Sequence, residues 1–256
     1  MHNRPAVLFI GGHDPTGGAG IQADIETAAA HGVHAMSLVT ALTAQDTRDV
    51  ATTWPTPVDA LLRQFDVLLG DMSPAAVKLG LLGDGPQVDA LAARLRNLRC
   101  PLVLDPVLAA GGGFDLDRGG LVAAVREHLL PLTTLVTPNR AEARRLSGLD
   151  DANDAASALL AAGAAAVLLT GADEAEGGQV RNRLFRADTA TRDYDWPRLP
   201  HAYHGSGCTL ASACAVRLAQ GHPIDEAVAM AQQFTWRALQ NAHAPGHGQW
   251  LPWRVQ

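Results

Sequence analysis

Residues 6–31 have the sequence AVLFIGGHDPTGGAGIQADIETAAAH, which holds a complete strand, loop and helix signal. The apolar run at 6–11 predicts a buried strand, and the spacing of apolar residues over 21–31 predicts a helix. The glycines between positions 11 and 20 allow the backbone to turn sharply. A strand joined to a helix in this way is the repeating unit of a parallel α/β sheet.

The same alternation of short apolar runs and longer Ala- and Leu-rich segments continues along the chain. The runs are continuously apolar, as expected when helices cover both faces of a sheet. Residues 179–196 differ, because two alternating segments around 186–191 predict an antiparallel hairpin. We predict an α/β fold with a mostly parallel, doubly wound sheet flanked by helices on both faces, as a single domain over residues 1–256. Further strands are expected at 34–42, 76–81, 102–104, 132–136 and 165–169, and further helices at 58–69, 87–98, 121–130, 141–146, 155–162, 209–220 and 224–242.

Composition and charge narrow the range of functions. The net charge is −6 and Lys78 is the only lysine, so no basic face for nucleic acid is expected. No apolar stretch is long enough for a membrane span or a signal sequence. Cys100, Cys208 and Cys214 lack CxxC spacing and the ten histidines are dispersed, which disfavours a disulfide framework and a transition-metal site. We expect a cytoplasmic protein that binds neither nucleic acid nor membrane.

Gly, Asp, Asn and Gln residues gather where the predicted strands end. Ligands of open α/β sheets bind beyond the carboxyl ends of the strands, so these residues predict one shared cleft. Turns favour the same residue types, which is the alternative explanation. The clusters comprise residues 11–20, Gln45, residues 80–84, Asp105 with Pro106, residues 137–139, and Thr170 with Gly171.

Residues 205–210, Gly-Ser-Gly-Cys-Thr-Leu, open a predicted helix. The two glycines allow N–H groups to turn inward and the helix N-terminus adds positive potential, so Gly205, Ser206 and Gly207 can hold an anion. The helix field favours the thiolate of a cysteine in this turn, which makes Cys208 a candidate general base. Alternatively, a hydroxyl residue caps a core helix and Cys208 is packing. Spacing leaves both interpretations open.

Residues 137–142, Thr-Pro-Asn-Arg-Ala-Glu, also allow two interpretations. Asn139 with Glu142 three residues later is close to a capping box, and spacing favours this. Alternatively, both residues organise Mg²⁺ beside nucleotide phosphates, where few protein carboxylates are needed. Asp105 is likewise either a turn residue or a carboxylate near the metal.

Two charged residues near the predicted strands, Asp24 and Lys78, are expected to reach solvent. Asp24 lies one turn into the first helix, and spacing favours a position facing solvent over one facing a ligand. Lys78 lies inside an apolar strand, and we expect its ammonium group to reach water at the end of the strand.

Taken in order, these motifs resemble the hydroxymethylpyrimidine/phosphomethylpyrimidine kinases of thiamine biosynthesis, within the ribokinase-like superfamily. The resemblance covers nearly the whole chain. Its most specific carriers are residues 12–24, GHDPTGGAGIQAD, and residues 204–210, HGSGCTL. The other carriers are TALTAQ at 40–45, KLGLL at 78–82, DPV at 105–107 and TPNRAE at 137–142.

The resemblance implies an enzyme that uses ATP and Mg²⁺ to phosphorylate 4-amino-5-hydroxymethyl-2-methylpyrimidine and then its monophosphate, to give the diphosphate. It implies that Gln45 hydrogen-bonds the aminopyrimidine, because an amide offers both a donor and an acceptor. It also implies an anion hole at Gly205, Ser206 and Gly207, with Cys208 as the base where sugar-kinase relatives carry aspartate. A homodimer is expected.

Further site residues follow from the same resemblance. Those implied to contact the substrate, besides Gln45, are Gly12, Asp24, Leu81 and Val107. Those implied for the nucleotide and Mg²⁺ region are Asp105, Asn139, Glu142, Thr170 and Gly171.

The sequence departs from the family's pattern at several positions, among them Leu81 where relatives often carry Met and His13 in place of a small hydroxyl residue. Residues 170–173 are TGAD where relatives often carry Lys-Gly-Gly-His, and residues 111–113 are three glycines.

Two other functions remain open. One alternative function is a pyridoxal or pyridoxine kinase of the same superfamily, although Gln45 and Gln22 favour the aminopyrimidine. The other is a non-catalytic pyrimidine-binding regulator, against which the intact segment 205–208 argues.

Overall fold

The computed structural model describes residues 4–109, 116–117, 119–172 and 178–255. The glycine run at 111–113 and Asp173, noted in the sequence, lie outside these residues. Within them the strands form one nine-stranded sheet in the order β3-β2-β1-β4-β5-β6-β7-β8-β9. The strands are β1 (Ala6–His13), β2 (His34–Gln45), β3 (Val50–Pro55), β4 (Ala76–Leu79), β5 (Leu102–Leu104), β6 (Leu135–Val136), β7 (Ala166–Leu169), β8 (Gln179–Arg186) and β9 (Arg192–Pro197).

The central strands are parallel, and antiparallel strands stand at both edges. Strands β2, β1, β4, β5, β6 and β7 run in one direction, while β3, β8 and β9 pair antiparallel. The chain passes from β1 to β2 on one side and returns to β4 on the other. This reversal makes the carboxyl ends of β1 and β4 the switch point, where such sheets bind ligands.

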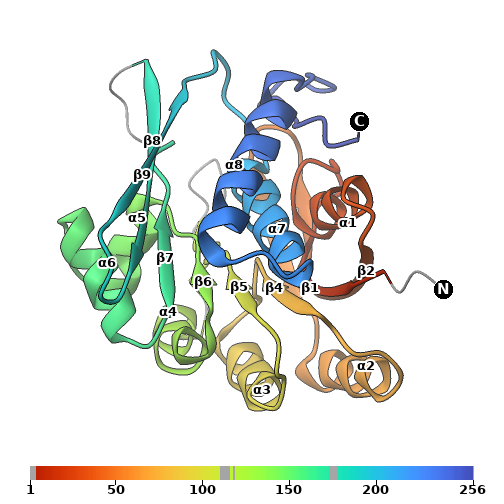
Figure 1. Ribbon diagram of the computed structural model, residues 1–256. Helices are drawn as coiled ribbons and strands as arrows, with labels where there is room; N and C mark the ends of the chain where they lie inside the picture. Colours follow the sequence, from red (N-terminus) through yellow and green to blue (C-terminus); the bar gives the residue numbers. More distant parts are fainter. Residues whose placement is uncertain (1–3, 110–115, 118, 173–177, 256) are drawn as a thin grey trace.

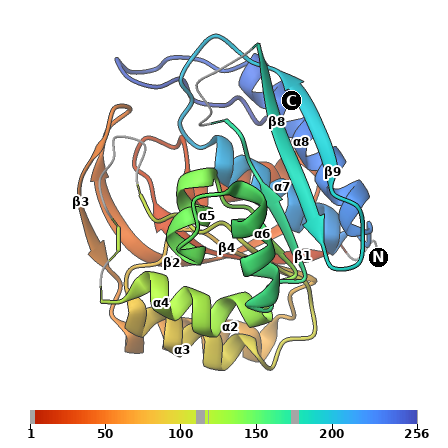
Figure 2. The ribbon, with the colours of Figure 1, turned by 90° about the vertical axis from the view of Figure 1, so that its left-hand side faces the viewer.

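Helices cover both faces of the sheet, as predicted (Figures 1 and 2). One layer contains α1 (Gly20–Ala30), α7 (Ser206–Ala219) and α8 (Ile224–Gln240). The other contains α2 (Val58–Asp71), α3 (Gly85–Leu95), α4 (Leu121–Ala124), α5 (Arg140–Ser147) and α6 (Ala152–Ala161).

Strand β1 shows why its sequence is continuously apolar. Val7 and Phe9 pack in the core beneath α1 and α7, while Leu8 and Ile10 pack in the core beneath the other layer. Successive side chains of a strand point to opposite faces, so both sets must be apolar when both faces are covered.

Three elements differ from the sequence prediction. Strand β3 was not predicted, and it pairs with an extension of β2 that reaches Gln45. The helix expected at 121–130 is α4 followed by a π-helical turn, Val125–Leu129, and a 3₁₀ turn, Leu130–Leu132. That 3₁₀ turn occupies the start of the strand expected at 132–136, so β6 begins only at Leu135.

The hairpin predicted within 179–196 is confirmed as β8 and β9. Among the described residues, no helix combines the length and the apolar character that a bilayer crossing requires.

Candidate functional site

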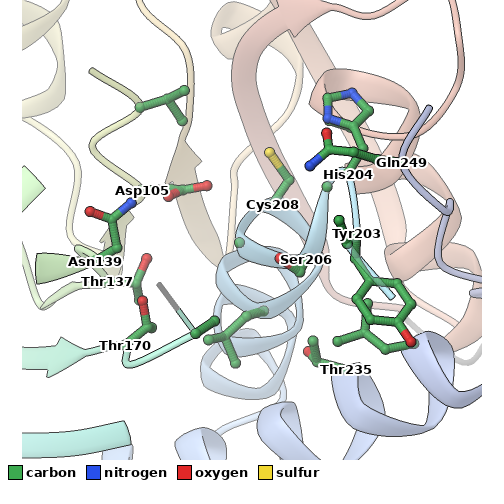
Figure 3. A pocket seen from close by; sticks show the side chains of 18 of the residues that line it. Asp105, Thr137, Asn139, Thr170, Tyr203, His204, Ser206, Cys208, Thr235 and Gln249 are labelled. Atoms are coloured by element: carbon green, nitrogen blue, oxygen red, sulfur yellow. The ribbon is translucent and has the colours of Figure 1, made fainter. Parts of the chain in front are cut away.

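A cavity of about 790 Å³ opens between the carboxyl ends of the strands and the N-terminal turn of α7 (Figure 3). This volume is within the range of pockets that bind small molecules and cofactors. The predicted site residues that line it are Gly12, Gln45, Leu81, Asp105, Val107, Asn139, Glu142, Thr170, Gly205, Ser206, Gly207 and Cys208. Segments far apart in the sequence therefore meet at one cavity.

Helix α7 begins at this cavity, and Gly205 is its N-cap residue. Gly205 has φ +84°, and a Cβ atom there would overlap the carbonyl oxygen of Gly18. Glycine meets both conditions without strain. Thr209 does not cap the helix, since its hydroxyl donates to the Gly205 carbonyl at 2.7 Å. The first N–H groups of the helix, at residues 206–208, thus lie where the helix dipole favours an anion.

The two glycine-rich loops are joined by Asp14 and His204. The Asp14 carboxylate accepts hydrogen bonds from the Thr16 and Ala19 N–H groups, each at 2.8 Å, and lies 2.8 Å from Nε2 of His204. Burial by itself raises the pKa of Asp14, but the hydrogen bonds from His204 and Thr16 outweigh it and hold the pKa below its ordinary value. An ionised Asp14 therefore fixes the first loop against the residue that precedes Gly205.

Gln45 lies at the end of β2, with its amide held by a neighbour on the same strand. Its Nε2 donates to the Thr43 hydroxyl at 2.7 Å, and that hydroxyl donates to the His13 carbonyl at 2.9 Å. One amide N–H is used in this way, and the side-chain oxygen has no partner in the described part of the chain. A remaining N–H and the oxygen can still meet a ring edge that offers both an acceptor and a donor.

Gly12 and Leu81 form one wall of the cavity near Gln45. A Cβ atom at Gly12 would collide with the Leu81 side chain, so glycine allows the leucine to pack over the loop. Val107 lines the same cavity just after β5.

Cys208 and Asp105 point toward the same part of the cavity (Figure 3). Burial raises the pKa of Cys208 to about 12; Lys78 opposes this effect, and Asp105 and Asp24 add to it. The helix field was expected to favour the thiolate, but the surroundings of Cys208 act in the opposite direction and favour the thiol. The loss of hydration and the two carboxylates outweigh the helix dipole.

The surroundings of the Asp105 carboxylate favour a bound cation. Burial raises its pKa, Lys78 opposes the effect, and one carboxylate oxygen is buried without a hydrogen-bond partner among the described residues. A buried carboxylate oxygen in this state is poorly compensated. Mg²⁺ binds carboxylates together with waters and phosphates, so Asp105 fits such an ion.

Asn139 and Glu142 form the capping box that the spacing favours. The Asn139 side chain accepts from the Glu142 N–H at 2.9 Å, and the Glu142 side chain accepts from the Asn139 N–H at 2.9 Å. Both side chains also line the cavity, as does Thr170. Gly171 stands between the lining residues Thr170 and Ala172, and its N–H donates to the Asn182 side chain at 3.0 Å, which ties the end of β7 to β8. Its place in the nucleotide region stays a prediction.

The expectations for Asp24 and Lys78 are both wrong. Their side chains are fully buried and form an ion pair of 2.9 Å, and Ser212 donates a hydrogen bond to Asp24. Asp24 is not among the residues that line the cavity, so it is neither a solvent-facing nor a substrate-contacting residue. The ammonium group lies beside Gly80, where a Cβ atom would approach it to 2.7 Å. Sequence spacing could not show that the helix and the strand bury complementary charges against each other.

Part of the cavity wall was missed by the sequence analysis. It is built by the hairpin and α8, where Gln232 accepts from Asn182 at 2.8 Å and from the Trp196 indole N–H at 3.1 Å. Gln249 lines the opposite side, on a tail segment whose N–H donates to the Thr47 carbonyl. Nothing in the local sequence marks these residues, because only tertiary folding brings them to the strand ends.

The comparison with protein families identifies the chain. A family model described as phosphomethylpyrimidine kinase matches residues 14–253. The chain belongs to this family. The matched region begins at Asp14 within the first glycine-rich loop, and it includes the whole second loop and every strand of the sheet after β1.

Curated relatives of the family match over most of this chain. A hydroxymethylpyrimidine/phosphomethylpyrimidine kinase of Streptomyces coelicolor is 38% identical over 95% of this chain and 92% of its own length. The enzyme of the same name from Bacillus subtilis is 35% identical over 94% of this chain and 91% of its own length. The thiamine biosynthesis bifunctional protein ThiED of Geobacter sulfurreducens is 39% identical over 96% of this chain, which spans 51% of that longer protein.

Solved structures agree with the family. Phosphomethylpyrimidine kinase from Clostridium difficile has a TM-score of 0.79 and 30% identity, covering 92% of this chain and all of that one. Pyridoxal kinase from Staphylococcus aureus in complex with pyridoxal has a TM-score of 0.89 and 28% identity, covering 98% of this chain and 93% of that one. The ribokinase-like α/β fold expected from the motifs is thereby confirmed.

Proposed function

We propose that residues 1–256 act as one kinase domain that transfers the γ-phosphoryl group of ATP to 4-amino-5-hydroxymethyl-2-methylpyrimidine, and then phosphorylates the monophosphate to the diphosphate, in thiamine biosynthesis. The observation that carries this proposal is that the N-terminus of α7 and the Gln45 amide open on one cavity. The N–H groups that can bind an anion and the amide that can hydrogen-bond an aminopyrimidine therefore face the same cavity.

In this mechanism the hydroxymethyl oxygen forms a bond to the γ-phosphorus, and the bond from that phosphorus to the bridging oxygen of ADP breaks. The N–H groups at Gly205, Ser206 and Gly207 stabilise charge on the moving phosphoryl group. Gln45, Gly12, Leu81 and Val107 orient the ring, and the Cys208 sulfur, once ionised, accepts the hydroxyl proton.

The Mg²⁺ and nucleotide region is proposed around Asp105, next to the N-terminal turn of α7. The lining residues Asp105, Asn139, Glu142 and Thr170 are assigned the contacts to the phosphates and the metal. These residues would hold a phosphate-bound Mg²⁺, which would supply positive charge against the charge that develops during transfer. Asp105 is the carboxylate that gains most from a cation, because burial leaves one of its oxygens without a partner.

The proposal is tested by ADP release with Mg·ATP and, in separate reactions, hydroxymethylpyrimidine, its monophosphate and pyridoxal. We expect turnover with the first two and an efficiency with hydroxymethylpyrimidine at least equal to that with pyridoxal. The likeness to pyridoxal kinase makes pyridoxal phosphorylation the second candidate function. A clear preference for pyridoxal favours that function. Binding of the pyrimidine without ATP turnover favours a non-catalytic regulator.

The proposal also includes a homodimer in the cytoplasm. Light scattering after size-exclusion chromatography measures the oligomeric state, and fractionation of the native cell measures the location.

A further inference from the structure

Arg254 is a buried arginine in the irregular tail that follows α8. It is 2% exposed, although arginine is rarely buried without partners. Its guanidinium donates to the Thr209 hydroxyl at 2.8 Å, to Glu26 at 2.9 Å, to the Gly17 carbonyl at 3.5 Å and to the Gly18 carbonyl. Figure 1 shows this end of the chain beside α1, which carries Glu26.

These acceptors belong to both glycine-rich loops. Gly17 and Gly18 lie in the loop after β1, and Thr209 lies in the first turn of α7. Thr209 passes the contact on, because its hydroxyl accepts from Arg254 and donates to the Gly205 carbonyl at 2.7 Å. A continuous series of hydrogen bonds thus runs from the tail to the N-cap of α7.

The guanidinium also lies where the two loops press together. A Cβ atom at Gly205 would overlap the Gly18 carbonyl and lie 3.0 Å from a terminal nitrogen of Arg254. The rigid fork of an arginine can address several acceptors at fixed angles, which a lysine cannot do. Arg254 itself is not among the residues that line the cavity.

We propose that Arg254 is a positioning residue for phosphoryl transfer, which holds the Gly205–Gly207 segment at the orientation that stabilises the moving phosphoryl group. The proposal rests on the proposed function of that segment as an anion hole. It assigns the tail a part in the reaction that neither loop sequence indicates. Preorganised donors lose much of their effect when misplaced by about 1 Å, which corresponds to a loss of about 10²-fold in rate.

The experiment compares Arg254→Lys and Arg254→Ala with a matched control, Glu26→Ala. The control removes the ion pair to a half-exposed carboxylate and leaves the contacts to Gly18 and Thr209 in place. We expect kcat per folded molecule to fall by about 10- to 100-fold in both Arg254 variants, while KM for hydroxymethylpyrimidine changes little and Glu26→Ala stays near native. Millimolar guanidinium chloride should restore part of the activity of Arg254→Ala.

Hydrogen exchange at the amide of Thr209, which donates to the Gly205 carbonyl at 3.0 Å, gives a second measurement that does not depend on turnover. We expect faster exchange in Arg254→Lys than in the native protein and in Glu26→Ala. A folded Arg254→Lys with native kcat and native exchange overturns the proposal. So does an equal loss in Glu26→Ala, which would assign the effect to the ion pair. A native protein without kinase activity but with the expected exchange pattern contradicts the proposed function, and with it the role of Arg254 in phosphoryl transfer, while it supports the hold of Arg254 on the Gly205–Gly207 segment.

Discussion

At the scale of single residues, Cys208 has the environment that most constrains the chemistry. It lies at the start of α7 beside Asp105, and burial raises its pKa to about 12. The alcohol substrate must lose a proton during transfer, whereas the monophosphate presents an oxygen that is already ionised near neutral pH. A base is therefore needed for the first phosphorylation and not for the second.

Replacing Cys208 by Ser tests this difference. We expect kcat with hydroxymethylpyrimidine to fall by about 10²- to 10⁴-fold and kcat with the monophosphate to change little, because general-base loss affects only the first reaction. Below its pKa the thiol is protonated and cannot accept a proton. The native rate with the alcohol should therefore rise with pH across the neutral range, and the variant should lack this rise. Equal effects on both reactions would remove Cys208 from the base role.

Gln45 is the second residue whose role can be measured directly. Replacing it by Leu leaves the polar edge of the substrate ring unpaired, at a cost of about 1–3 kcal/mol or roughly ten- to a hundredfold in binding. We expect KM for hydroxymethylpyrimidine to rise more than kcat falls, with KM for ATP unchanged. Steady-state kinetics measure all three constants. Thr43→Val is the control, since it releases the Gln45 amide without removing it, and a native KM in Gln45→Leu would exclude the residue from the pocket.

At the scale of elements, the ion pair of Lys78 and Asp24 joins β4 to α1 beneath the cavity. Burial by itself lowers the pKa of Lys78, but the charge of Asp24 and of the groups around it raises the pKa above its ordinary value. Ser212 of α7 donates to the same carboxylate, so three elements meet at one buried charge. The ion pair holds β4, α1 and α7 together beneath the two glycine-rich loops.

Replacing Lys78 by Met leaves Asp24 buried without its countercharge. We expect the free energy of unfolding to fall by about 3–5 kcal/mol, because breaking a buried pair strands the remaining charge. Urea unfolding followed by circular dichroism measures the change. The double variant Lys78→Met/Asp24→Asn should recover much of the loss. If the single and the double variant are equally unstable, the ion pair is not the cause.

At the scale of the whole molecule, the cavity is closed by segments from both ends of the chain. The loop after β1 and the tail around Gln249 face the hairpin and α8 across it. Binding of a ligand there should therefore stabilise the fold as a unit, rather than one loop.

Mg·ADP is the ligand that tests this coupling. At a concentration of about 100 times its Kd, a ligand that binds only the folded state adds about 2.7 kcal/mol to the free energy of unfolding. We expect a corresponding rise in Tm by scanning fluorimetry, most of which is lost when EDTA removes the metal. Asp105→Asn should bind ADP with a smaller dependence on Mg²⁺. A rise in Tm that is the same with and without Mg²⁺ would contradict the proposed metal region.

The sequence by itself determined the alternation of strands and helices, the hairpin of β8 and β9, the two glycine-rich loops and the family. These features depend on local propensity and on motifs whose residues are close together in the chain, so they are visible before folding. The capping box of Asn139 and Glu142 was visible for the same reason, because its partners are three residues apart.

Tertiary structure alone decided where the charges lie. Three features each require groups that are distant in sequence. They are the burial of Asp24 against Lys78, the raised pKa of Cys208 and the hydrogen bonds of Arg254 to the two glycine-rich loops. The hydration that a group loses, and the charges it then meets, depend on which segments pack together. No local pattern contains that information, and it is this packing that sets the chemistry of the site.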